Sequence, residues 1–137
     1  AGIVLRPEVI AEFGPRARYF NTFGGNPVAA AAGKAVLDTI RIDGLQQNAF
    51  EVGNYLMEGL KALSGRYHAI GDVRGSGLFI GVEIVADPAA KSPDAALTTR
   101  IVNGLRERHI VIRASGPRAN ALKIRPPLVF TAAHAVA

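Results

Sequence analysis

Leu78-Phe79-Ile80-Gly81-Val82-Glu83-Ile84-Val85 is the stretch of this chain with the clearest strand character. Its residues are mostly β-branched, aromatic or apolar, which are the types that favour extended backbone. It closes a longer segment, 70–85, that is rich in glycine and β-branched residues. Gly81 permits a bulge or the close approach of a neighbour. This segment therefore predicts a sheet in the second half of the chain.

Helical patterns lie on both sides of this segment. Small and apolar residues recur at helical spacing from Pro27 to about Ile42, and an apolar stripe marks a second helix over Leu45–Leu63. Asp43-Gly44 marks the turn between the two helices, and Ser64-Gly65 ends the second one. After a polar loop, a third helix is predicted over about Asp94–Arg108.

Two short strands are predicted nearer the C-terminus, at Ile110–Arg113 and Leu122–Arg125. The turn-rich segment 115–120 joins them as a hairpin with a longer loop. Thr131 is suited to cap a final helix. With the strands of 70–85, these elements predict a small α+β unit, an antiparallel sheet of three or four strands with helices on one face and a long linking helix before it.

The N-terminal residues have a different pattern. Residues 1–5 are predicted to form a short apolar strand, and a helical turn is predicted over Glu8–Phe13, which Gly14-Pro15 breaks. Residues 16–23 then run extended. We expect residues 1–42 to expose an apolar surface and therefore to cause self-association or instability of the chain.

The length and amino-acid composition of the chain exclude several classes of function. The 137 residues suffice for one ordinary domain with a core, and the absence of cysteine excludes disulfides and thiolate metal sites. The three histidines are too scattered to predict a metal site. The net charge of +5 comes from scattered basic residues, so we expect no nucleic-acid partner. No apolar run predicts a membrane span, and we expect a cytoplasmic protein.

The segment Phe20-Asn21-Thr22-Phe23-Gly24-Gly25-Asn26-Pro27 is predicted to be an anion-binding elbow. Asn26 is a good N-cap and Pro27 suits the first position of a helix. Gly24 and Gly25 let the backbone approach a ligand closely, and a helix start offers free N–H groups to a phosphate. The Thr22 hydroxyl can add a further donor. The alternative is that Thr22 belongs to an ordinary turn.

Lys123 and Arg125 form a second candidate site. They alternate with Leu122 and Ile124, so on a strand both side chains point to the face away from the core. Two neighbouring cations repel each other unless a bound anion or a nearby carboxylate compensates their charge. The alternative is that they are surface charges of an edge strand.

Arg74 follows Asp72 in a glycine-rich turn. We expect its role to be structural, as a tie between this turn and nearby carbonyls or Asp72.

Three segments together carry a family resemblance: 20–27, 69–78 (Ala-Ile-Gly-Asp-Val-Arg-Gly-Ser-Gly-Leu) and 123–128 (Lys-Ile-Arg-Pro-Pro-Leu). In order and spacing they resemble the C-terminal third of class III, ornithine aminotransferase-like, pyridoxal-phosphate enzymes. The resemblance implies an α/β protein of fold type I. Residues 1–42 would close the large cofactor-binding domain and supply the linking helix, and 43–137 would form the small C-terminal domain, cut short at its C-terminus.

The resemblance also implies roles for the candidate residues. Thr22, with Gly24 and Gly25, would bind the phosphate of pyridoxal 5'-phosphate held by the neighbouring subunit of a homodimer. Many class III enzymes bind the substrate carboxylate through an arginine at the position of Lys123, whereas here the arginine is at 125. In this respect the sequence resembles the branch of the family that contains alanine–glyoxylate aminotransferase-like enzymes and ethanolamine-phosphate phospho-lyases.

We therefore expect the full-length protein to move an amino group between an amine or amino acid and a keto acid or aldehyde. The lysine that holds the cofactor in this family has no counterpart among Lys34, Lys61, Lys91 and Lys123, so the chain alone is expected to be inactive. A phospho-lyase acting on a phosphorylated amine is the alternative within the family. A stand-alone anion-binding or dimerisation module is the alternative of another class.

Overall fold

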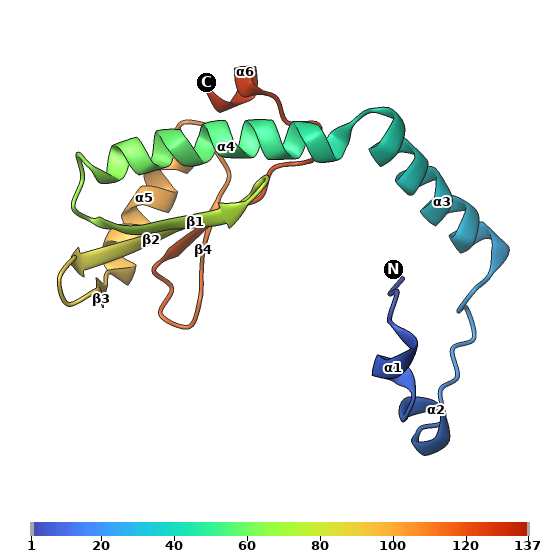
Figure 1. Ribbon diagram of the computed structural model, residues 1–137. Coiled ribbons are helices and arrows are strands. Elements are labelled where there is room, and N and C mark those ends of the chain that lie inside the picture. Colours follow the sequence, from blue (N-terminus) through green and yellow to red (C-terminus); the bar gives the residue numbers. More distant parts are fainter. Residues whose placement is uncertain (1, 137) are drawn as a thin grey trace. The chain divides into compact units, whose positions relative to one another are not determined.

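The computed structural model describes residues 2–136 and divides the chain into two compact units (Figure 1). The first unit ends at Asp43 and the second begins at Gly44. We describe each unit by itself.

In the described part of the first unit, residues 2–43, the regular elements are helices. Its main element is α3 (Pro27–Ile42), which begins and ends as predicted, and the Asn26 side chain caps it by accepting a hydrogen bond of 2.9 Å from the backbone N–H of Ala29. Two single-turn helices precede it, α1 (Pro7–Ile10) and α2 (Phe13–Arg16).

Two predictions for the first unit are wrong. Residues 2–5 are not a strand, because none of the strands in the part of the chain that the structure describes pairs with them. Gly14-Pro15 does not break the helical segment but lies inside α2, where Pro15 is within the first turn and its missing N–H leaves no helix bond unmade.

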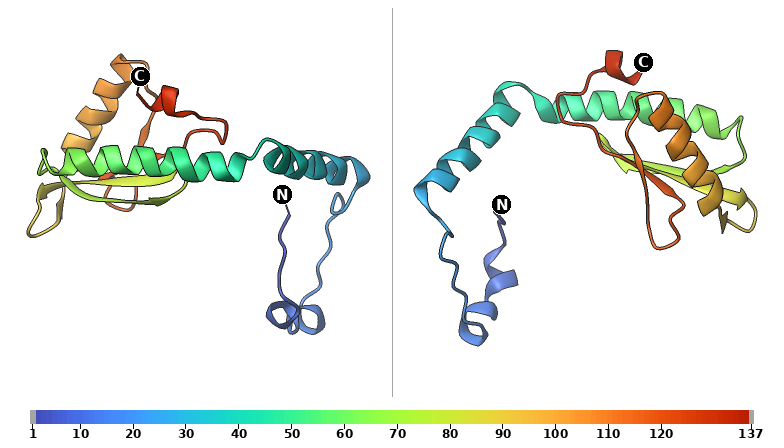
Figure 2. Two further views of the ribbon diagram at one scale, coloured as in Figure 1. Left: turned by 45° about the horizontal axis from the view of Figure 1, so that its top comes forward. Right: turned by 180° about the vertical axis from the view of Figure 1, so that it is seen from behind.

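The second unit is built on an antiparallel sheet (Figures 1 and 2). Its strand order is β1-β2-β5-β4, and a two-residue strand, β3, pairs with β2 off this path. The strands are β1 (Ile70–Ser76), β2 (Phe79–Asp87), β3 (Ser92–Pro93), β4 (Arg113–Ser115) and β5 (Ala121–Ile124). The strand predicted at Ile110–Arg113 is wrong in its position: β4 begins where the prediction ended, because only Arg113–Ser115 find partners on β5.

Helices α4 (Leu45–Ser64) and α5 (Ala95–Glu107) pack on one face of this sheet, as predicted (Figure 2). The core consists of Val82, Ile84 and Leu122 from the sheet, with Leu60 of α4 and Ile101 of α5 packed against them. The predicted class, an α+β unit with helices on one face of an antiparallel sheet, is confirmed.

A close contact between two glycines sets the position of α4 against the β1–β2 turn. A Cβ atom at Gly53 would lie 2.2 Å from the carbonyl oxygen of Gly77, and Gly77 itself has a φ of +52°. The helix and the turn can approach this closely only because Gly53 carries no side chain, and the positive φ of Gly77 favours glycine in the turn.

The C-terminal segment adds α6 (Ala132–Ala135), which packs against α4. Thr131 is its N-cap, as the sequence predicts, and the His134 side chain completes a capping box. Among the described helices, none is long and apolar enough to cross a bilayer.

Candidate functional site

The predicted anion-binding elbow is an exposed turn over residues 22–25, directly before α3. The Asn21 carboxamide oxygen accepts a hydrogen bond of 3.1 Å from the Phe23 N–H, and the Asn21 carbonyl accepts one of 3.1 Å from the Gly24 N–H. Gly25 has a φ of +73°, a conformation that favours glycine. These bonds hold the turn in shape and use the N–H groups of Phe23 and Gly24, whereas the Gly25 N–H makes no hydrogen bond within residues 2–136.

Two residues of the elbow have different roles. Asn26 is engaged as the helix cap, and its amide also donates a hydrogen bond of 2.7 Å to the Phe23 carbonyl, so it is a structural residue. Within residues 2–136, the exposed Thr22 hydroxyl has no hydrogen-bond partner. The donor set of the Thr22 hydroxyl, the Gly25 N–H and the helix start fits a phosphate group.

The second candidate site lies in the other unit, on the face of the sheet opposite α4 and α5. The pairing register sets Lys123 opposite Gly81 on β2 and opposite Arg113 on β4. Residues opposite each other in paired strands point to the same face. Lys123 and Arg113 therefore share the outer face, with their Cβ atoms about 5 Å apart.

No carboxylate compensates this pair. Within the part of the chain that the structure describes, Lys123, Arg113 and Arg125 form no ion pair, and Asp72 and Glu83 on the same sheet are both engaged with Arg74. Two unpaired like charges on opposite strand positions are unfavourable unless an anion binds between them.

The side chain of Lys123 lies over an aromatic ring. Its ammonium nitrogen is 5.8 Å from the centroid of the Phe79 ring, which is itself 56% exposed. Gly81, opposite Lys123, leaves the space beside it open, because an added Cβ would approach no atom more closely than the Arg74 carbonyl oxygen at 3.9 Å. The ammonium group is therefore accessible on an open part of the sheet.

A pocket of about 380 Å³ adjoins Phe79 at this end of the sheet. Arg125 contributes to its wall, together with Ser76 and Gly77 of the β1–β2 turn and Phe50 of α4. The structure thus brings Arg125 and Phe79 together around one pocket and sets Lys123 over Phe79.

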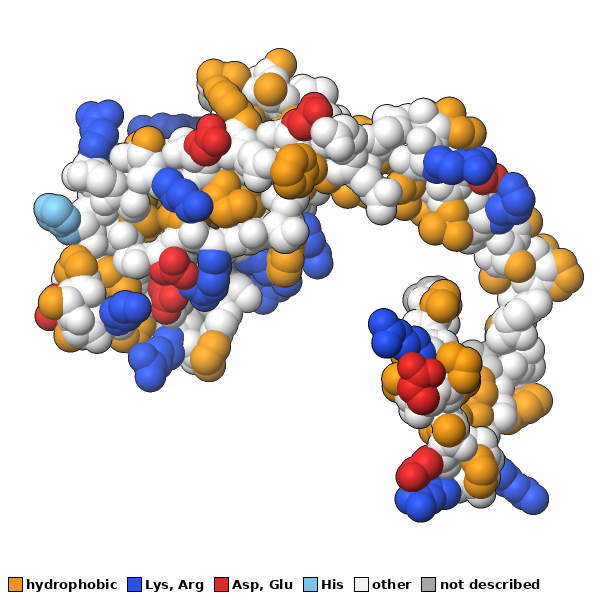
Figure 3. Space-filling model, in the orientation of Figure 1, with side chains coloured by type: hydrophobic (Ala, Val, Ile, Leu, Met, Phe, Trp, Pro, Cys, Tyr) orange, Lys and Arg blue, Asp and Glu red, His pale blue; other side chains and the backbone are white. Residues whose placement is uncertain are grey.

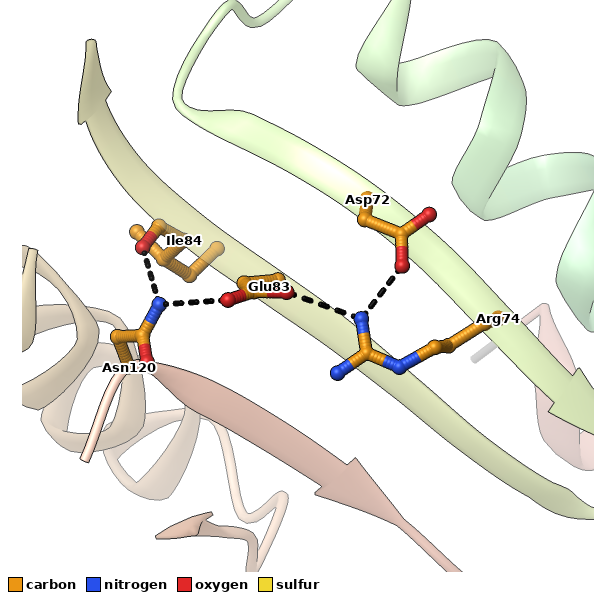
Figure 4. Close-up of polar contacts among 5 residues, drawn as sticks. All are labelled: Asp72, Arg74, Glu83, Ile84 and Asn120. Atoms are coloured by element: carbon orange, nitrogen blue, oxygen red, sulfur yellow. Dashed lines mark hydrogen bonds and ion pairs between the residues drawn. The ribbon is translucent and has the colours of Figure 1, made fainter. Parts of the chain in front are cut away.

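A polar network crosses the same face next to Lys123 (Figure 4). Arg74 donates hydrogen bonds of 2.5 Å to Asp72 and 3.0 Å to Glu83, and the Asn120 amide donates bonds of 3.3 Å to Glu83 and 3.0 Å to the Ile84 carbonyl. The predicted tie between Arg74 and Asp72 is confirmed. The hydrogen bonds from Arg74 and then Asn120 lower the pKa of the Glu83 carboxyl, and the bonds to Asp72 and Glu83 raise the pKa of Arg74.

Sequence reasoning missed Arg113 and Phe79 as neighbours of Lys123. The predicted hairpin set Arg113 opposite Leu122, one position from the observed partner Lys123, and a shift of one residue moves a side chain to the other face. The contact with Phe79 had no local signal, since it depends on how β2 and β5 pair.

The comparisons with known proteins agree with one another. The profile of the class III aminotransferase family matches residues 1–137. The chain is 46% identical over 129 residues to "Alanine--glyoxylate aminotransferase 2 homolog 2, mitochondrial" from Arabidopsis thaliana, covering 94% of this chain and 27% of that protein.

Two solved structures are similar as well. A phospholyase from Arthrobacter in complex with phosphoethanolamine has a TM-score of 0.83 at 42% identity, over 94% of this chain and 31% of that one. An amine transaminase from an uncultivated Pseudomonas species in its PLP-bound form has a TM-score of 0.79 at 35% identity, over 90% of this chain and 28% of that one.

The fold is that of pyridoxal-phosphate-dependent transferases of fold type I. The chain belongs to the class III aminotransferases, the family that the sequence resemblance predicted, and the cofactor of this family is pyridoxal phosphate. It spans about a quarter of the length of its curated relatives.

Proposed function

We propose that this chain is part of a pyridoxal-phosphate-dependent aminotransferase that moves an amino group between an amine or amino acid and a keto acid or aldehyde. The observation that carries the proposal is the uncompensated pair Lys123 and Arg113, which a negatively charged substrate group would stabilise. Membership of the class III family supplies the reaction type.

Pyridoxal phosphate, when bound, supplies the reactive carbonyl and the electron-withdrawing ring on which amino transfer depends. The part of this chain is to hold the phosphate: the Thr22 hydroxyl and the Gly25 N–H are its donors, and Gly24, without a side chain, lets the phosphate approach the backbone. The exposure of this elbow supports a role toward the cofactor of a neighbouring subunit, so we propose a homodimer. In this assignment residues 1–42 end the large domain and 43–137 form the small one.

Lys123 and Arg125 are the proposed substrate-binding residues, and Arg113 joins them. Lys123 provides a point charge, and Arg125 at the pocket wall provides a planar fork that can bind a carboxylate or phosphate through two bonds. When the anionic end of the substrate binds to these residues on the sheet, the position of its amine end is fixed as well.

A phospho-lyase acting on a phosphorylated amine is the second candidate. A lysine at 123 with Arg113 opposite it suits a doubly charged phosphate, and the similarity to the Arthrobacter phospholyase supports this alternative. A stand-alone anion-binding or dimerisation module, based on the Thr22 elbow, is the candidate of another class.

One experiment separates the candidates. The full-length protein that contains this chain would be loaded with pyridoxal phosphate and offered an amino donor with pyruvate or glyoxylate, and separately phosphoethanolamine. We expect amino transfer that depends on the keto acid. Phosphate release without a keto acid would favour the phospho-lyase, and no reaction in either assay would favour the module.

Cytoplasmic localisation also remains a proposal. The Arabidopsis relative is named as mitochondrial. Fractionation of cells that express the full-length protein would decide between the two compartments.

A further inference from the structure

Lys123 has two possible partners on β2, one on each side. It lies opposite Gly81, so Phe79 is its diagonal neighbour in one direction and Glu83 in the other. Diagonal neighbours are about 7–8 Å apart at Cα, a distance that a lysine and a glutamate can bridge. In the structure the ammonium group lies over Phe79 instead.

The carboxylate of Glu83 is already occupied. Its Oε2 accepts a hydrogen bond of 3.0 Å from Arg74 and its Oε1 accepts one of 3.3 Å from Asn120 (Figure 4). Both bonds come from directions other than Lys123: Arg74 is on β1, at the far side of β2, and Asn120 directly precedes β5. The lowered pKa of Glu83 agrees with a carboxylate that is held in its charged form.

Asn120 is fixed more firmly than Arg74. Its side chain is buried and also bonds to the Ile84 carbonyl, while its own carbonyl accepts a bond of 2.8 Å from the Ile84 N–H. The Arg74 side chain is 58% exposed and depends on its carboxylate partners for its position. Arg74 is therefore the member of the network whose charge can be removed with little effect on packing.

We propose that Arg74 is a positioning residue that holds the Glu83 carboxylate away from Lys123, so that the Lys123 ammonium remains free for the anionic group of the substrate. Without Arg74, Glu83 would pair with Lys123 and compete with the substrate for it. Asp72, the other acidic member, is on β1 and is separated from Lys123 by β2. The substrate part of this inference rests on the proposed function, whereas the competition between Arg74 and Lys123 for Glu83 does not.

The test uses the full-length protein and four variants. Arg74→Ala should raise the KM of the anionic substrate about two- to fivefold, which corresponds to one exposed ion pair, and should leave kcat nearly unchanged. Arg74→Gln, which keeps a polar side chain of similar length, should act in the same direction. Arg74→Ala combined with Glu83→Gln should return KM to the wild-type value. Arg100→Ala removes an exposed arginine from α5, on the other side of the sheet, and is the matched control.

A second measurement does not depend on activity. Competitive labelling with acetic anhydride, read by mass spectrometry, reports how much of each lysine amine is unprotonated. Labelling of Lys123 relative to Lys61 should fall in Arg74→Ala, because pairing with Glu83 favours the ammonium form, and should recover in the double variant.

The outcomes are distinct. A raised KM that Glu83→Gln does not relieve, or Lys123 labelling that is the same in all variants, would overturn the proposal. Absence of any activity together with the expected labelling pattern would reject the proposed function and leave the role of Arg74 supported.

Discussion

At the scale of single residues, the outer face of the sheet separates two groups of charges. Arg74 is neutralised by Asp72 and Glu83, whereas Lys123 and Arg113, two and three strands away, share no carboxylate. The alternation of Lys123 and Arg125 with apolar neighbours was enough to predict that they point away from the core. Their electrostatic isolation was not visible in the sequence, because it depends on which carboxylates Arg74 engages.

Lys123→Ala should have a larger effect than Arg113→Ala in the full-length enzyme. Lys123 is half-buried as a residue, and a hydrogen bond from its charged group to an anion contributes about 1.5–3 kcal/mol, so the KM of the anionic substrate should rise roughly 10- to 150-fold. The exposed Arg113 should contribute about 1 kcal/mol or less, a change of up to about fivefold. Steady-state kinetics with anionic and uncharged amines would check this, and an equal loss for both kinds of amine would argue against the substrate role.

The network around Glu83 predicts a pH dependence of stability. Its pKa in the folded chain is below the ordinary 4.5, so its contribution is present above that value and is lost as the pH falls through the folded pKa. The bonds to Asp72 and Glu83 raise the pKa of Arg74, so its contribution is present throughout the acid and neutral range. In Glu83→Gln we expect the urea concentration at the midpoint of unfolding to fall less steeply as the pH drops below 4.5. The difference in free energy of unfolding should be at most about 1 kcal/mol, because the ion pair between Arg74 and Glu83 is partly exposed. An unchanged slope in the variant would show that other carboxylates cause the acid sensitivity.

At the scale of elements, helices were predicted far better than strands. The predicted ends of α3 agree with the structure, and α4 is one residue longer than predicted. Helices can be predicted in this way because their hydrogen bonds join residues close in sequence, and the spacing of apolar residues indicates which segments are helical. Residues 2–5 and Ile110–Ile112 have the composition of strands but are not strands. A strand requires hydrogen-bond partners distant in sequence, and no local pattern reveals whether they exist.

The contact between α4 and the β1–β2 turn gives a matched pair of glycine substitutions. Gly53→Ala should destabilise the chain by about 1–3 kcal/mol, since its Cβ would overlap the Gly77 carbonyl and this outweighs the gain in helix propensity. Gly59→Ala in the same helix meets no atom within 4 Å and should instead stabilise by up to about 1 kcal/mol. Urea denaturation of both variants would measure this difference, and a stabilising Gly53→Ala would show that the helix can move away from the turn.

At the scale of the whole molecule, apolar surface is exposed on both units. The first unit exposes Val4 at 99%, Phe20 at 87% and Phe23 at 78%, and Figure 3 shows hydrophobic side chains on its surface. The predicted exposure of apolar residues in 1–42 is thus confirmed. In the second unit, a groove of about 880 Å³ is lined mainly by aliphatic side chains, among them Leu56 and Leu60 of α4 and Leu105 of α5.

We therefore predict that the isolated 137-residue chain associates with itself. Sedimentation velocity over a range of concentrations should show species larger than a monomer, and a chain truncated to residues 44–137 should associate less. A stable, well-folded monomer of the full chain would contradict this expectation and would favour the stand-alone module.

The sequence by itself determined the family, the three long helices α3, α4 and α5, and the residue types of both candidate sites, because periodicity, capping and short motifs are local properties of the chain. Only the tertiary structure decided that Lys123 lies opposite Arg113, that its ammonium rests over Phe79, and that Arg74 and Asn120 hold Glu83. The reason is that strand register joins residues distant in sequence, such as Ile80 and Ile124, and the charge that each side chain meets is set by those partners.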